Sequence, residues 1–122
     1  MDKQQAYYNL WSSFNIPAYE ELSVPDDAVF PYITYQVLLD DIDGIIFPTA
    51  SLWYRGTSWT EIDAKLEEIS EFIEDMSPIP LKDGGYMHVD KGTPWAQPMA
   101  EDNDRTVRRY LLNLSVEFFT RT

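Results

Sequence analysis

Histidine, cysteine and clustered carboxylates are the side chains that most often carry catalysis or bind metals, and this sequence offers few of them in a usable arrangement. The single histidine, His88, stands between Met87 and Val89 in a stretch with strand character, and the chain contains no cysteine. A zinc site or an activated nucleophile needs partners at suitable spacing. We therefore expect a structural or surface role for His88, and we predict no catalytic residue, no metal and no cofactor.

Carboxylates are abundant, with 21 Asp and Glu residues, but their spacing does not select a site. Residues 40–44 superficially resemble a calcium loop, yet an EF-hand needs a closing Glu at its twelfth position, where this sequence has Ser51. A solvated hairpin turn is the better interpretation, and the acidic residues 101–104 indicate a loop. The sequence also lacks the phosphate-binding, dinucleotide-binding and hydrolase motifs, so we expect a protein that is not an enzyme.

The elements that would position any functional residue can be read from apolar periodicity. Apolar residues spaced by three and four positions predict a helix over residues 4–14 and a second one that ends before residue 77. Ser58 and Glu61 have the spacing of a capping box at the start of the second helix. Alternating and β-branched residues predict strands at residues 32–39, 45–55, 86–91 and 107–120, with loops at residues 17–31 and 92–104. Pro48 indicates a bulge or an edge position.

This order of elements predicts one domain over residues 1–122 with an α+β fold, in which two helices pack on one face of an antiparallel or mixed sheet. The last strand has one apolar and one mixed face, which is typical of a central antiparallel strand. The chain is long enough, and apolar enough at 44%, to bury one core. It has no apolar run that could cross a bilayer and no signal sequence, so we expect a soluble protein made in the cytoplasm.

Charge is distributed unevenly along the chain. The net charge is −12, and residues 20–75 contain fourteen acidic residues against two basic ones, whereas residues 105–122 carry +3. An acidic body repels phosphates, which argues against a reader of DNA or RNA but permits a basic strand to meet a neighbour's acidic face. Glu71, Glu74 and Asp75 crowd the end of the second helix, where the helix dipole disfavours them. This acidic surface is either solvated for solubility or faces a basic partner or passing DNA.

Five runs of residues give the sequence a family resemblance. They are FPYITY at 30–35, ASLWYRGTSW at 50–59, DGGY at 83–86, KGTPWAQ at 91–97 and RRYLLNLSVEF at 108–118. Together they cover about residues 30–119, and the pattern resembles the tail terminator (tail completion) proteins of long-tailed bacteriophages. The resemblance implies a structural virion protein, with helices on a sheet, that forms a hexameric ring. Such a ring caps the tail tube, ends its polymerisation and offers a surface for joining the head.

The resemblance also implies the partners and the place of action. The partners would be further copies of the chain, the tail tube protein and a head–tail connector protein, with DNA only as passing cargo and no membrane. The place would be the neck region of the virion tail. We predict three groups of interface residues. The first is an acidic hairpin with Asp40, Asp41 and Asp43, and the second is a set of anchors for a neighbouring subunit, Trp95, Gln97 and Met99. The third is a set of cations that face acidic residues of a neighbour, Arg105, Arg108 and Arg109.

Two other functions fit the same sequence features. A head-completion or connector-stopper ring would share the acidic composition and the assembly into a ring, but its partner would be on the portal side. An acidic inhibitor or nucleic-acid mimic would instead be monomeric or dimeric and would bind a basic protein tightly. A small hydrolase that uses carboxylates is the least favoured alternative.

Overall fold

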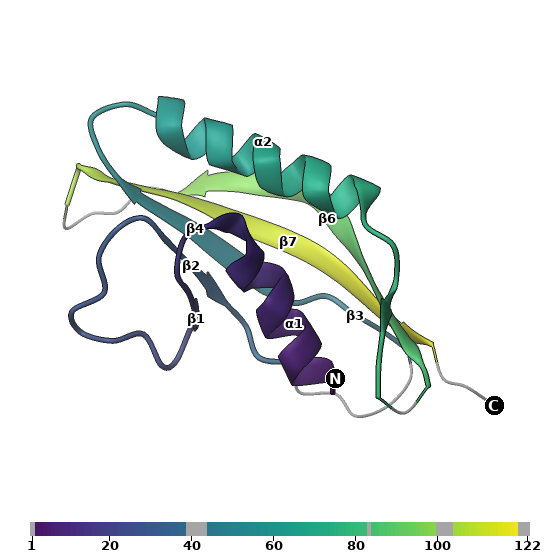
Figure 1. Cartoon of the computed structure of the whole chain (residues 1–122). Helices are drawn as coiled ribbons and strands as arrows, with labels where there is room; N and C mark the ends of the chain where they lie inside the picture. Colours follow the sequence, from purple (N-terminus) through teal and green to yellow (C-terminus); the bar gives the residue numbers. More distant parts are fainter. Residues whose placement is uncertain (1, 39–43, 83, 100–103, 120–122) are drawn as a thin grey trace.

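In the computed structural model, residues 2–38, 44–82, 84–99 and 104–119 are described, and they form a mixed β-sheet with two α-helices (Figure 1). The α+β class predicted from the sequence is confirmed. The elements in chain order are α1 (Lys3–Trp11), a 3-10 turn (Ser12–Phe14), β1 (Ala18–Glu20), β2 (Tyr32–Tyr35), β3 (Gly44–Ile46), β4 (Thr49–Arg55), α2 (Thr60–Asp75), β5 (Ile79–Pro80), β6 (Tyr86–Met99) and β7 (Val107–Phe119).

The sheet is built around β7. Its strand order is β1-β2-β4-β7-β6-β5, and β3 also pairs with β7. The β1–β2 pair is parallel, and the other pairs are antiparallel. The prediction that the last strand is central and antiparallel is therefore confirmed. Because β7 pairs with both β4 and β6, its register sets which side chains of these strands lie side by side.

The core lies between the helices and one face of the sheet. Lys3 of α1 lies 4.3 Å from the ring centroid of Phe118, and Asp63 of α2 accepts a hydrogen bond from Tyr110. Tyr110 and Phe118 are eight residues apart on β7, so they point to the same face. The side chains buried between these layers include Tyr7, Trp11, Phe14, Ile33, Leu52, Ile62, Ile69, Ile73, Leu112, Leu114 and Val116. We call the opposite face of the sheet the open face.

The helices begin and end for local reasons. The Asp2 side chain accepts a hydrogen bond from Gln5 N at 2.8 Å and caps α1, and Asn15 in the left-handed region ends the 3-10 turn that follows. The capping box predicted for α2 is wrong. The N-cap is Trp59, which makes no side-chain cap, so Glu61 stands one position too early to complete a box. The apolar stripe of α2 buries Ile62, Ile69 and Ile73 as expected, whereas Phe72, which the same spacing predicts to be in the core, is 43% exposed.

Several strand boundaries differ from the prediction. β1 lies inside the expected loop over residues 17–31, and β2 ends at Tyr35 rather than at residue 39. The loop expected over residues 92–104 is wrong for residues 92–99, because β6 continues to Met99 through a bulge between Lys91 and Ala96. The short strand β5 was not predicted.

Pro48 interrupts the strand predicted over residues 45–55. It accepts a hydrogen bond from Leu114 N at 3.2 Å but has no N–H to return, and the stretch divides there into β3 and β4. Both strands pair with β7, so the break changes the ladder without moving the chain away from the central strand.

Candidate functional site

A row of four side chains crosses the open face on neighbouring strands. Tyr32 of β2 pairs with Trp53 of β4, Trp53 pairs with Arg109 of β7, and Arg109 pairs with Met99 of β6. The rings of Tyr32 and Trp53 stack with centroids 6.1 Å apart, and the Arg109 guanidinium lies 4.6 Å from the Trp53 ring centroid. Paired residues share one face of a sheet. The strand register therefore assembles an aromatic and cationic row from four separate segments.

Hydrogen bonds from the adjacent row of residues hold the two central groups in place. Trp53 Nε1 donates to Thr34 Oγ1 at 2.9 Å, and Arg109 Nε donates to Ser51 Oγ at 3.1 Å. Thr34 and Ser51 are paired across β2 and β4, and both are buried. A cation over an aromatic face gains about 0.5–2 kcal/mol, depending on its exposure to solvent. Arg109 is thus already oriented on the open face before any partner binds.

The row continues into the segment before β2. The ring centroids of Phe30 and Tyr32 are 5.1 Å apart, and the Arg55 guanidinium lies 4.8 Å from the Phe30 centroid. An open hollow of about 540 Å³ adjoins this segment, lined by Ala28, Val29, Phe30, Pro31, Tyr54, Arg55 and Glu61. The lining combines apolar side chains with one cation and one carboxylate.

The other end of the open face carries large apolar side chains. Ile45 pairs with Glu117, and Tyr86 pairs with Phe119 across β6 and β7. The exposed fractions are 52% for Ile45, 74% for Phe47, 50% for Tyr86 and 46% for Phe119. Clustered exposed apolar side chains on a small protein mark an interaction surface more often than single ones do. We call Ile45, Phe47, Tyr86 and Phe119 the apolar end of the open face.

The β6 bulge places Trp95 and Gln97 beside the central strand. Asn113 Nδ2 donates to Pro94 O at 3.0 Å and to Gln97 Oε1 at 3.1 Å, which ties the two ends of the bulge to β7. Trp95 packs partly buried against the core, and its indole N–H has no hydrogen-bond partner among the described residues. Trp95 is therefore mainly a packing residue, whereas Gln97 is exposed on the open face.

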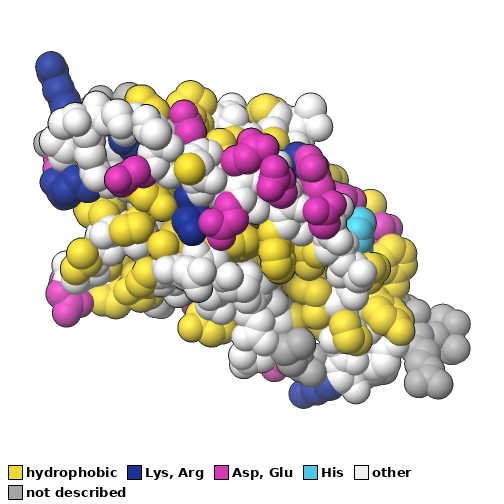
Figure 2. All heavy atoms as spheres, turned by 45° about the horizontal axis from the view of Figure 1, so that its top comes forward, with side chains coloured by type: hydrophobic (Ala, Val, Ile, Leu, Met, Phe, Trp, Pro, Cys, Tyr) yellow, Lys and Arg dark blue, Asp and Glu magenta, His cyan; other side chains and the backbone are white. Residues whose placement is uncertain are grey.

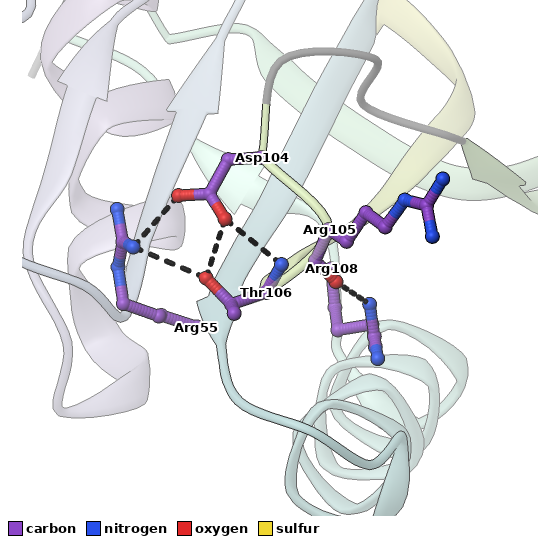
Figure 3. Close-up of polar contacts among 5 residues, drawn as sticks. All are labelled: Arg55, Asp104, Arg105, Thr106 and Arg108. Atoms are coloured by element: carbon purple, nitrogen blue, oxygen red, sulfur yellow. Dashed lines mark hydrogen bonds and ion pairs between the residues drawn. The ribbon is translucent and has the colours of Figure 1, made fainter.

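Arg55, Asp104, Thr106, Arg105 and Arg108 form what we call the arginine tip, at the β4–α2 end of the sheet (Figure 3). Arg55 Nη1 contacts Asp104 Oδ2 at 2.7 Å, and Thr106 donates to Asp104 through its backbone N at 2.9 Å and its hydroxyl at 2.6 Å. These hydrogen bonds from Thr106, followed by the Arg55 guanidinium, hold the pKa of Asp104 below its usual value.

The remaining two arginines of the tip lie outside this network. Arg108 donates to the backbone carbonyl of Arg105, and its guanidinium lies 5.4 Å from the Trp59 ring centroid. Arg105 is exposed and points away from Asp104 (Figure 3). Among the described residues, neither Arg105 nor Arg108 has an acidic partner.

The solvent side of α2 is acidic. Figure 2 shows acidic side chains gathered on this side of the molecule, with hydrophobic side chains beside them. An open hollow of about 390 Å³ lies at the C-terminal half of the helix, lined by Glu68, Glu71, Phe72, Asp75 and Met76. Glu68 pairs with Lys65 at 3.0 Å, and Glu74 pairs with Lys91 of β6. Within the part of the chain that the structure describes, Glu71 and Asp75 have no ion-pair partner.

The structure does not bring the predicted interface residues together as one site. Asp40, Asp41 and Asp43 lie outside the described residues. Gln97, Met99 and Arg109 lie on the open face, whereas Trp95 packs against the core and Arg105 lies in the connection before β7.

The predicted cation group is divided between the two faces of the sheet. Arg108 contacts Trp59, whereas Arg109 contacts Trp53 on the open face. Consecutive strand residues point to opposite faces, so alternation along the sequence could have separated these two arginines.

Sequence reasoning missed the row formed by Tyr32 and Trp53, and it also missed the exposed Phe47. Alternation places Tyr32 and Trp53 opposite the core residues of their strands, but their adjacency depends on the register between β2 and β4.

The described residues include no group of three or more His, Asp or Glu side chains that could hold a metal ion. His88 lies on the open face with its Nδ1 atom 3.4 Å from Asp90 Oδ2, and it is the single histidine of the sequence. Burial and a 2.6 Å hydrogen bond to Asp63 raise the pKa of Tyr110 to about 12, so this phenol stays protonated at neutral pH. The open face thus presents aromatic, apolar and charged side chains.

Neither helix formed by the described residues has the length and apolar content needed to span a bilayer. Comparison with protein-family models, with curated proteins and with solved structures finds no match to this chain.

Proposed function

We propose that this chain is a non-enzymatic structural subunit that assembles into a ring at the head-proximal end of a long-tailed phage tail. There it would end tube polymerisation and offer the surface for joining the head. The observation that carries the proposal is the open face of the sheet. It presents an aromatic and cationic row at one end and four exposed apolar side chains at the other.

The residues of the sequence resemblance meet on this face. Tyr32 comes from the first run, Trp53 from the second and Arg109 from the last, and the three are direct neighbours across β2, β4 and β7. Gln97, at the end of the fourth run, pairs with Leu111 one row away. Runs that are distant in the sequence therefore combine into one surface, which supports an assembly role for that surface.

The first experiment measures the mass of the purified protein by light scattering, alone and with purified tail tube protein. Six copies of a 14.2 kDa chain would give about 85 kDa. We expect a ring in at least one condition, together with arrest of tube growth seen by electron microscopy. A monomer that leaves tube growth unchanged would refute the proposal. A monomer that instead binds a basic protein tightly would support the acidic-inhibitor function.

A matched pair of variants tests the open face itself. Phe47→Ser removes an apolar side chain that is 74% exposed at the apolar end, and we expect it to abolish tube arrest while the fold is retained. Leu22→Ser is the control, because Leu22 is 87% exposed but lies in the turn after β1. Equal loss of arrest in both variants would argue against a specific role for the open face.

A further inference from the structure

Two charged surfaces lie at opposite ends of α2. The arginine tip adjoins the N-terminal end, where Arg108 contacts the N-cap residue Trp59. The acidic hollow adjoins the C-terminal end around Phe72. At about 1.5 Å per residue, the thirteen positions from Trp59 to Phe72 separate the two surfaces by about 20 Å. A straight helix keeps them apart, so the arginines of one copy cannot reach the hollow of the same copy.

Each surface carries charged side chains that have no ion-pair partner among the described residues. In the tip, Asp104 is occupied by Arg55 and Thr106, which leaves Arg105 and Arg108 without an acidic partner in the described part of the chain. In the hollow, Glu71 and Asp75 stand at the helix end where the dipole already disfavours negative charge. A cation from outside the subunit would offset this unfavourable interaction between the carboxylates and the helix dipole.

The residues that line the hollow are also suited to bind an arginine side chain. Its acidic side chains surround Phe72, which is 43% exposed, and the half-buried Met76. An arginine places its apolar stem on such a floor while its planar guanidinium meets the carboxylates around it. A lysine lacks the planar guanidinium, so it would make weaker contacts with both the apolar floor and the carboxylates.

We propose that the arginine tip of one copy docks into the acidic hollow of a second copy, with Arg105 and Arg108 facing Glu71 and Asp75. The proposal rests on the proposed function, because it names the contact by which neighbouring ring subunits join. A second copy is the fitting occupant because every chain carries both complementary surfaces. Since the two surfaces differ, the contact is heterologous and repeats head to tail, which is the type of interface that closes into a ring.

Disulfide cross-linking tests the contact directly, because the chain has no cysteine of its own. Glu71→Cys and Arg105→Cys are made in separate batches, mixed, assembled with and without tail tube protein, and oxidised. We expect a linked heterodimer in at least about tenfold greater yield than from the control mixture of Glu71→Cys with Lys82→Cys, since docking raises the local thiol concentration. Lys82 is an exposed cation away from the tip.

Charge reversal tests the pairing independently. We expect Arg105→Glu to raise the concentration needed for half-maximal assembly about tenfold or more, and added Glu71→Lys to restore much of it. Lys82→Glu should change assembly little, and circular dichroism checks that each variant is folded. A cross-link without rescue would overturn the charge pairing.

The outcomes also separate this contact from the proposed function. Oligomers that form without the link between positions 71 and 105 would overturn the contact and leave the ring function standing. Absence of oligomers in both conditions would overturn the contact together with the ring function.

Discussion

Replacing Gly92 by alanine tests how the β6 bulge is held against the central strand. A Cβ atom at position 92 would lie 2.9 Å from the carbonyl oxygen of Asn113, 3.0 Å from its carbonyl carbon and 3.1 Å from its Cβ. The two nearest of these atoms belong to the backbone of β7, which pairs on both sides with β4 and β6. They cannot rotate away as a flexible side chain would, so either the bulge or the strand must move.

The expected loss follows from two opposing terms. Overpacking of this kind costs about 1–3 kcal/mol. Alanine has less conformational entropy than glycine in the unfolded chain, which stabilises the folded state by about 0.4–1 kcal/mol. We therefore expect Gly92→Ala to lower the free energy of unfolding by about 1–2 kcal/mol, which corresponds to a melting temperature lower by about 3–8 °C for a chain of this length.

Gly56→Ala is the matched control. A Cβ atom there meets nothing within 4 Å, so only the entropic term acts and the variant should be as stable as the parent or slightly more stable. Urea unfolding followed by circular dichroism measures both variants, and an unchanged m-value would show that a comparable surface is exposed in each. If Gly92→Ala proves as stable as Gly56→Ala, the close approach of the bulge to β7 is wrong.

Three further predictions concern the core residue Ile69, the phenol of Tyr110 and the ion pair between Lys91 and Glu74. Ile69→Ala should lower the free energy of unfolding by about 2–5 kcal/mol in urea titration, because Ile69 is fully buried, and a smaller change would place it outside the core. Burial and the hydrogen bond to Asp63 raise the pKa of Tyr110 from 10.0 to about 12, so this residue's contribution to stability is full below pH 10 and is lost between pH 10 and 12. The melting temperature of Tyr110→Phe should therefore fall less between pH 10 and pH 12 than that of the parent. An equal fall in both proteins would contradict the raised pKa of Tyr110. Lys91→Met removes the contacts to Glu74 and Ser70 and should cost about 0.5–1 kcal/mol in low salt, with a smaller cost in 1 M NaCl; equal costs would rule out a charge effect.

The elements that have a strong local pattern could be predicted from the sequence alone. The apolar stripe through Ile62, Ile69 and Ile73 identifies α2, since a helix must place those positions on one buried face. The alternation from Tyr110 to Phe118 identifies β7 and its apolar face in the same way. Together these patterns were enough for the α+β class.

Elements that depend on a partner distant in the chain could not be predicted from local patterns. The three residues of β1 are too few to show a period, and they are a strand only because β2 offers a parallel edge. β6 runs through Gly, Thr and Pro to Met99 because β7 continues beside it beyond the bulge.

The candidate surface depends most on tertiary register. Tyr32, Trp53 and Arg109 become neighbours through the pairing of β2, β4 and β7, and a shift of one residue would send each side chain to the other face. The opposition of the arginine tip and the acidic hollow likewise depends on where α2 lies on the sheet. Local periodicity specifies which face a residue occupies within its own element, whereas long-range pairing specifies which residues meet across elements.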